Sequence, residues 1–183
     1  TPLEGAFPLS QTLDTVCAMT RSVQDCLAVD GILAGQPLQV LQRPLAGRRL
    51  LLPTTLLMDQ LEPAVAAAFG QALTALSAAG ALIVEAPWQA LNDIAALNSP
   101  GGFSAVEAFA THRDHLATHR DAFDPRVAAR IALGQGVSAA DYLQLHARRR
   151  AWIAQAHACL GGFDAALCPT VPLLAPPIAP LEA

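Results

Sequence analysis

Residues 49–87 carry the sequence RLLLPTTLLMDQLEPAVAAAFGQALTALSAAGALIVEAP. The stretch begins with a short apolar run at 49–52 that ends at Pro53. A second apolar run follows at 81–85 and ends before Pro87. Short apolar runs bounded by proline are typical of buried strands. The two runs therefore predict two strands inside this stretch.

The segment between the two runs predicts a long helix. Glu62 and Pro63 suit a first helical turn, because proline has no N–H to leave unpaired there and a carboxylate favours the positive end of the helix. We expect the helix to extend to Ala79 and to end at Gly80. Strand, helix and strand at this spacing predict a βαβ unit over about residues 49–86, in which the strands are parallel and the crossover is right-handed.

The rest of the chain predicts mainly helices and connectors. Expected helices cover about residues 21–33, 103–121, 125–133 and 138–160, with Thr20, Asp124 and the pair Ser138 and Asp141 as N-terminal caps. Residues 37–44 and 98–102 predict connectors, and residues 164–168 predict a third strand. The proline-rich segment from Pro169 to Pro180 favours extended backbone.

The composition favours a single domain with apolar area left on its surface. Of the 183 residues, 53% are hydrophobic and only 14% are charged. A chain of this size builds one core, but so few charges cannot cover its surface. We therefore expect either a piece of a larger globule or a protomer of a homo-oligomer.

Charge and cysteine usage argue against several kinds of partner. The net charge of -4 gives no basic footprint for nucleic acid, and Arg148–Arg150 fits a solvated helix face. No segment reaches the roughly 18 continuous apolar residues of a membrane span, and the N-terminus does not resemble a signal peptide. The four cysteines lie far apart, which indicates buried reduced thiols in a cytoplasmic protein.

Three separated blocks resemble the amidase signature family. The first is GAFPLSQTLDTV at residues 5–16 followed by RSVQD at 21–25, and the second is DPRVAARIALG at 124–134 followed by SAADY at 138–142. The third is FDAALCPT at 163–170. The order and spacing of these blocks carry the resemblance over nearly the whole chain. It implies an α/β fold: part of the amidase signature fold, with a mixed β-sheet flanked by helices.

The resemblance also implies an enzymatic reaction. Enzymes of this family cleave the C–N bond of a carboxamide with a serine, a second serine in a cis peptide, and a lysine. All eleven basic residues of this chain are arginine, and the glycine- and serine-rich signature of the family is absent. We therefore expect a single partial domain over 1–183 that lacks the N-terminal catalytic segment and the C-terminal segment that returns to the sheet. On this interpretation the chain contains no catalytic residue, and alone it is inactive.

Two residues are candidates for substrate binding by resemblance. In the amidotransferase branch of the family, an arginine at the position of Arg130 contacts the carboxylate of the substrate, and a guanidinium suits that role because its planar fork offers two parallel donors. Arg130 also fits a surface ion-pair residue. Glu107 lies where the family often has a glutamate near the pocket, although it also fits an ordinary helix carboxylate. Tyr142 and Asp164 match family positions that we interpret as structural.

Other hypotheses remain open on the sequence alone. Ser10 and Ser104 could replace the missing nucleophile, but Ser10 fits a local turn better. His112, His115 and His119 share one helix face, yet a polar face is the simpler interpretation, and we expect no metal and no cofactor. A small-molecule amide is the expected partner. The alternatives are the A subunit of glutamyl-tRNA amidotransferase, which the region 103–121 disfavours, and a non-catalytic interaction module whose proline-rich C-terminus docks on aromatic grooves.

Overall fold

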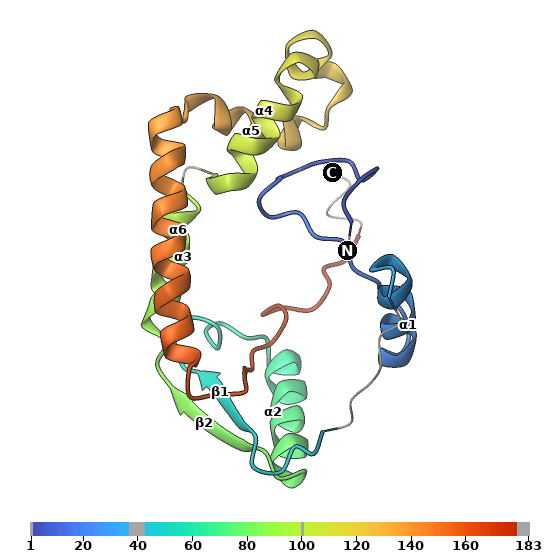
Figure 1. Ribbon diagram of the computed structural model, residues 1–183, viewed down its shortest axis with the longest axis vertical. Coiled ribbons are helices and arrows are strands. Elements are labelled where there is room, and N and C mark those ends of the chain that lie inside the picture. Colours follow the sequence, from blue (N-terminus) through green and yellow to red (C-terminus); the bar gives the residue numbers. More distant parts are fainter. Residues whose placement is uncertain (1, 37–42, 100, 179–183) are drawn as a thin grey trace. The chain divides into compact units, whose positions relative to one another are not determined.

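The computed structural model describes residues 2–36, 43–99 and 101–178 (Figure 1). The chain divides into two compact units, one formed by Thr1–Arg43 with Ala96–Arg149 and the other by Pro44–Ala95 with Arg150–Ala183. Most of the predicted connector at 37–44 lies outside the described residues, as does position 100 of the predicted loop at 98–102. The two units are described separately below.

The second unit contains the predicted βαβ unit. β1 (Arg49–Pro53) and β2 (Leu82–Ala86) are parallel, with Arg49 opposite Leu82 and Pro53 opposite Ala86. α2 (Pro63–Ala78) connects them, and Figure 1 shows it beside the two strands. Gly80 follows α2 with a φ of 91°, a left-handed conformation that favours glycine. The predicted fold class is confirmed, and the predicted strand and helix boundaries in this part of the chain agree with the observed ones to within one residue.

The third predicted strand is present but shorter than expected. β3 (Ala165–Ala166) pairs in parallel with β1, so the strand order is β2-β1-β3. The three strands that the structure describes are all parallel, and no antiparallel strand of the predicted mixed sheet is among them. Asp164 sits at the start of β3, where its carboxylate accepts from the backbone N–H of Arg49 at 2.9 Å and from the Arg48 guanidinium at 2.6 Å. The structural role predicted for Asp164 is confirmed.

The central strand β1 forms the core of this unit. Leu50, Leu51 and Leu52 are buried, and Leu51 has no exposed surface. Each neighbouring strand protects one edge of β1, whereas β2 is partly exposed and β3 fully so. Trp152 donates its indole N–H to the carbonyl of Ala90 at 2.6 Å, which connects the C-terminal part of α6 (Ala139–Leu160) to η1 (Gln89–Asp93), the short helix after β2.

The first unit is helical. Its helices are α1 (Val23–Leu33), α4 (Gly102–Thr118), α5 (Pro125–Ala132) and the N-terminal part of α6 (Ala139–Leu160). Short helical segments complete the described chain: η1 (Gln89–Asp93), α3 (Ile94–Leu97), η2 (Arg120–Ala122) and η3 (Leu133–Gly136). The helix predicted at 103–121 thus ends at Thr118 and is followed by the single turn of η2.

Two of the predicted helix caps are confirmed and one is wrong. The hydroxyl of Ser138 accepts from the N–H of Asp141 at 3.1 Å and donates to the carboxylate of Asp141 at 2.6 Å. The N-cap of α1 is Ser22, not Thr20, because the Ser22 hydroxyl accepts from the N–H of Asp25. Thr20 instead donates its hydroxyl to the carbonyl of Ser22, two residues later.

Helices α4 and α5 pack around a small apolar cluster. Ala108 and Leu116 from α4 contact Ala128 and Ile131 from α5, and all four are buried. η3 then passes so close to α4 that a Cβ built on Gly134 would lie 2.2 Å from the carbonyl oxygen of Ala105. A side chain at position 134 would force the two segments apart.

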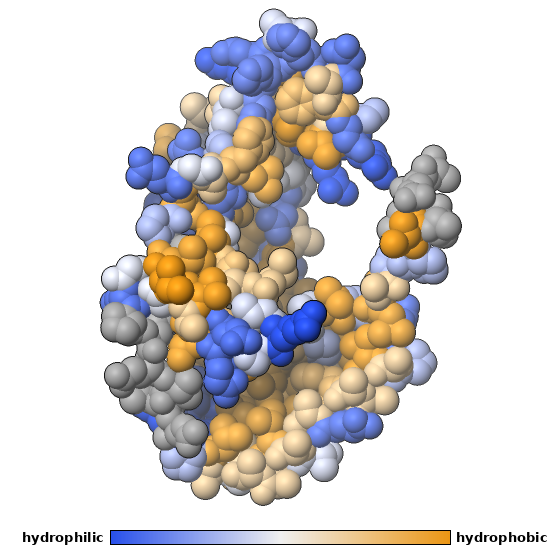
Figure 2. Space-filling model, turned by 90° about the vertical axis from the view of Figure 1, so that its right-hand side faces the viewer, coloured by the Kyte–Doolittle hydropathy of each residue, from blue (hydrophilic) through white to orange (hydrophobic). Residues whose placement is uncertain are grey.

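The surface exposes many apolar side chains, as the composition predicts. Figure 2 shows hydrophobic residues spread over one face, and Phe7, Met19, Val23 and Ile32 are among the most exposed of the large ones. No helix in the described ranges has both the length and the apolar character needed to cross a membrane. The cysteines are free, but Cys17 and Cys168 are exposed and the other two are only half-buried, so the prediction of buried thiols is wrong.

Candidate functional site

Glu107 is the centre of a polar cluster in the first unit. It lies on the same side of α4 as the buried residues Phe103 and Ala108, and it is only 8% exposed. A carboxylate on a buried helix face is costly unless hydrogen-bond donors surround it. The structure supplies these donors from two parts of the chain, the N-terminal segment and α6.

Four donors meet the two oxygens of Glu107. Oε2 accepts from the hydroxyl of Ser10 at 2.6 Å and from the backbone N–H of Thr12 at 2.8 Å. Oε1 accepts from the hydroxyl of Thr12 and from the phenol of Tyr142, the latter at 2.5 Å. A carboxylate offers about four lone-pair positions, so protein donors fill all of them.

These contacts set the protonation of the cluster. Burial raises the pKa of Glu107, but the hydrogen bonds from Ser10, Thr12 and Tyr142 outweigh it, so the pKa lies below its ordinary value of 4.5. Burial raises the pKa of Tyr142, and the hydrogen bond to Glu107 raises it further. Glu107 is therefore an anion at neutral pH and Tyr142 a neutral donor.

His112, on the same helix, fixes the segment that leads to Ser10. Its Nε2 lies 3.0 Å from the carbonyl oxygen of Pro8, and because a carbonyl only accepts, Nε2 carries the proton. The imidazole also stacks on the ring of Phe7, with 4.9 Å between ring centroids. His112 is thus buried in a structural contact.

The N-terminal segment forms a tight turn between these anchors. The carbonyl of Ser10 accepts from the N–H groups of Leu13 and Asp14, and the carboxylate of Asp14 accepts from the N–H of Leu9 at 2.9 Å. The turn borders a hollow of about 310 Å³. Its lining residues are Leu3, Ala6, Phe7, Pro8, Gln11, Asp14, Thr15 and Val16.

Ser10 has a different role from the local turn serine that the sequence predicts. Its backbone carbonyl does take part in the turn, but its hydroxyl bonds to Glu107, 97 residues away in the sequence. Ser10 is only 1% exposed, so its hydroxyl is closed to an incoming substrate. Ser104, the other candidate, is half-buried on α4.

Tyr142 has the packing role with a polar tip that its position predicts. Its ring packs edge-on against Phe103 and His146, while its phenol donates to Glu107. The guanidinium of Arg149 lies over the ring of Phe103, 5.7 Å from its centroid. Arg148 and Arg150 are exposed, as expected of a solvated helix face.

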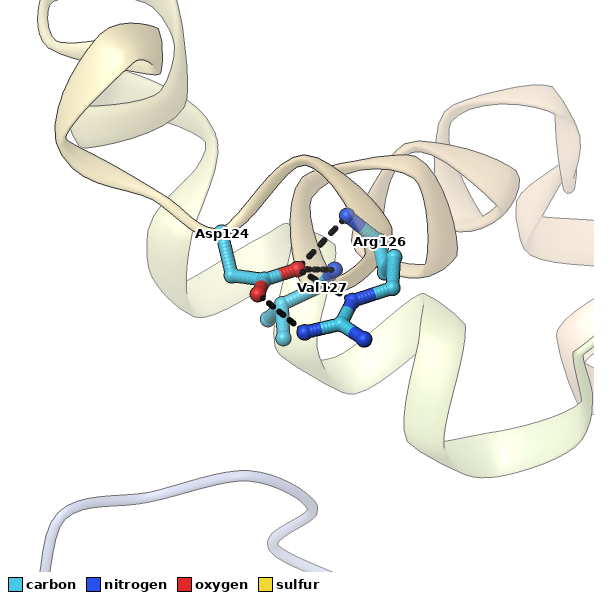
Figure 3. Close-up of polar contacts among 3 residues, drawn as sticks. All are labelled: Asp124, Arg126 and Val127. Atoms are coloured by element: carbon cyan, nitrogen blue, oxygen red, sulfur yellow. Dashed lines mark hydrogen bonds and ion pairs between the residues drawn. The ribbon is translucent and has the colours of Figure 1, made fainter. Parts of the chain in front are cut away.

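Arg130 lies on α5, away from any ionic partner in the described part of the chain. It is exposed in the last turn of the helix. At the other end of α5, Asp124 accepts from the N–H groups of Arg126 and Val127 and from the Arg126 guanidinium (Figure 3). The side-chain hydrogen bond from Arg126 is the main cause that holds the pKa of Asp124 well below its usual range. The cap predicted at Asp124 is thereby confirmed, and Arg126 rather than Arg130 neutralises it.

The three histidines predicted to share a helix face have different surroundings, and His119 lies just after the last residue of α4. His112 is buried, whereas His115 and His119 are exposed with their ring centroids 6.4 Å apart. Among the described residues, no group of three histidine, cysteine or acidic side chains is placed to hold a metal ion.

Comparison with known proteins identifies the family. The family model described as Amidase matches residues 1–182. The 2-amino-5-chloromuconic acid deaminase of Comamonas testosteroni is 32% identical over 97% of this chain, and an indoleacetamide hydrolase of Agrobacterium vitis is 34% identical over 51% of it. The chain spans 39% of the first relative and 20% of the second.

Solved structures agree with this assignment. A crystal structure of an amidase aligns with a TM-score of 0.85 and 30% identity, over 97% of this chain and 40% of the other. The allophanate hydrolase of Kluyveromyces lactis shares the fold over 77% of this chain and 23% of its own, with a TM-score of 0.66 and 23% identity. With a family match from residue 1 to residue 182, the chain belongs to the amidase family.

Proposed function

We propose that this chain is part of an amide hydrolase that cleaves the C–N bond of a small carboxamide. The observation that carries the proposal is the family match over residues 1–182. The names of two relatives support it: one hydrolyses indoleacetamide and the other removes an amino group from 2-amino-5-chloromuconic acid. Both reactions break a C–N bond.

The proposed mechanism is acyl transfer through a serine. The serine hydroxyl attacks the amide carbonyl, and a second serine and a neutral lysine relay its proton to the leaving amine. Backbone N–H groups stabilise the oxyanion, and water then releases the carboxylic acid. This chain has no lysine, so we assign these groups to a part of the enzyme upstream of it.

Within the chain, Arg130 is our candidate for direct substrate contact. It is exposed, and an arginine fork binds a carboxylate with two parallel hydrogen bonds. The relative from Comamonas acts on a substrate named as an acid, whereas indoleacetamide is a neutral amide. We therefore propose that Arg130 contributes to binding only if the substrate carries a carboxylate.

We propose that Glu107 contributes to the substrate site indirectly, because the segment that it contacts also forms a wall of the hollow. Its four acceptor positions are occupied by Ser10, Thr12 and Tyr142, which leaves none for a substrate.

The free cysteines are compatible with a reducing, cytoplasmic compartment, and a homo-oligomer would cover part of the exposed apolar surface.

Ammonia release by the protein made from its complete reading frame tests the proposal. The substrates are indole-3-acetamide, 2-amino-5-chloromuconic acid and glutamine, and the 183-residue chain alone is assayed in parallel. We expect the complete protein to release ammonia from at least one of the first two and the chain alone to release none. Turnover by the chain alone would overturn the assignment of the nucleophile, and turnover of glutamine only would favour the amidotransferase alternative.

A further inference from the structure

We propose that Glu107 is a positioning residue that holds residues 10–14 in the shape that forms the wall of the hollow. The inference rests on the proposed function for its effect on substrate binding. The structural part of it concerns the segment alone and can be tested without any activity.

The carboxylate of Glu107 connects the N-terminal segment and α6 to α4. The carboxylate binds Ser10 and Thr12 from the N-terminal segment and Tyr142 from α6, so three separate parts of the chain meet at one side chain. Thr12 is held through both its backbone and its side chain. Because one of these hydrogen bonds involves the backbone N–H of Thr12, Glu107 fixes the backbone path of the segment as well as the side-chain rotamer of Thr12.

The segment that Glu107 contacts also lines the hollow. Ser10 and Thr12 face Glu107, while Gln11 between them lines the hollow. On the N-terminal side, Phe7 and Pro8 also line the hollow, and His112 holds both of them. Glu107 and His112, both on α4, therefore hold the segment that forms the wall of the hollow.

Glu107, rather than His112, contacts the residues of the turn itself. His112 reaches only Pro8 and Phe7, which precede the turn. Among the described residues, Glu107 accepts the hydrogen bonds that Ser10 and Thr12 donate outside the segment, and the local hydrogen bonds of the turn go to Ser10 and Asp14. Loss of the carboxylate charge should thus loosen residues 10–14 while Phe7 and Pro8 keep their contacts.

The test measures hydrogen exchange in the complete protein. Glu107→Gln keeps the shape of the side chain but replaces one acceptor oxygen by an NH₂ donor, which cannot accept from Ser10 or Thr12. We expect the amide of Thr12 to exchange at least about 10-fold faster, since its hydrogen bond is lost or shared. Asp114→Asn is the matched control on the same helix, because its side chain is 95% exposed, and it should leave the exchange unchanged.

A second variant keeps the test valid if Glu107→Gln does not fold. Thr12→Val removes the hydroxyl but keeps the N–H and the carboxylate, so exchange around position 12 should rise by a smaller factor. Unchanged exchange at Thr12 in a folded Glu107→Gln protein would overturn the proposal, as would equal effects of Glu107→Gln and Asp114→Asn.

Steady-state kinetics then connect the segment to substrate binding. With a turned-over amide, Glu107→Gln should raise KM about 10-fold and lower kcat less, because a loosened wall weakens binding without touching the reacting atoms. A fall in kcat alone would overturn the positioning role. If the protein turns over no amide at all, the proposed function fails, while the exchange result still decides the role of Glu107.

Discussion

Thr12 donates both its backbone N–H and its side-chain hydroxyl to the carboxylate of Glu107, which lies 95 residues later in the sequence. Both bonds are charge-assisted and therefore stronger than bonds between neutral groups. A single side chain on α4 thus determines the backbone path of a turn that has no regular secondary structure of its own.

Removing the phenol of Tyr142 should destabilise the protein. Tyr142→Phe keeps the ring contacts with Phe103 and His146 but deprives the buried carboxylate of one donor. We expect the free energy of unfolding to fall by about 1–3 kcal/mol in urea titrations. Thr118→Val is the control, because that exposed hydroxyl bonds to the nearby Asp114 carbonyl and His119 ring, and it should change stability by less than about 0.5 kcal/mol. Equal stabilities of the two variants would contradict the prediction.

The stabilising effect of Glu107 should disappear in acid. Its pKa in the folded chain lies below the ordinary value of 4.5, so the folded state favours the anion. The contribution is complete above the ordinary value and is lost as the pH falls through the lower folded value. The difference in unfolding free energy between wild type and Glu107→Gln should therefore be constant near neutral pH and shrink below about pH 4.5. Asp124, Asp141 and Asp164 also have lowered pKa values, but they are present in both proteins and cancel in this difference.

Two glycines in η3 should respond differently to substitution. Gly134→Ala places a methyl group against the carbonyl of Ala105, whereas a Cβ on Gly136 meets nothing within 4 Å. We expect Gly134→Ala to cost about 1–3 kcal/mol of stability through overpacking. Gly136→Ala should be neutral or slightly stabilising, since it restricts the unfolded chain. Thermal unfolding of both variants checks this, and an undisturbed Gly134→Ala protein would show that η3 does not approach α4 so closely.

Arg130 should matter for charged substrates only. In the complete protein, Arg130→Gln removes the fork that we propose to bind a substrate carboxylate. We expect KM to rise about 10- to 100-fold for a carboxylate-bearing amide and to stay unchanged for a neutral one. Arg120→Gln, a change at an exposed arginine outside α5, is the control. An equal loss for neutral and charged amides would count against carboxylate recognition.

The parts of the fold that the sequence predicts correctly depend on neighbouring residues. The cap at Asp124 and the capping pair Ser138 and Asp141 form hydrogen bonds to residues within three positions in the sequence. The local sequence is therefore enough to predict them. The strand Arg49–Pro53 follows from a continuous apolar run. Where two hydroxyls compete within one short segment, as Thr20 and Ser22 do before α1, the local pattern permits either and the prediction selected the wrong one.

The cluster around Glu107 could not be predicted in the same way. The family resemblance marked Glu107 and Tyr142 individually, but it assigned no contact between them. Ser10 and Glu107 lie 97 positions apart, and nothing in either local sequence specifies the pairing. The one usable signal was a carboxylate among apolar residues on a helix face, since such a group must find donors elsewhere in the fold.

The position of β1 in the sheet has a consequence for how the polypeptide matures on the ribosome. β1 pairs with β2 about thirty residues later, but its opposite edge pairs with Ala165 and Ala166, more than a hundred residues later. During synthesis, that hydrophobic edge therefore emerges well before its partner and stays open for several seconds at about 5–20 residues per second. Chaperones should consequently be needed to protect nascent chains of this protein until translation has passed β3.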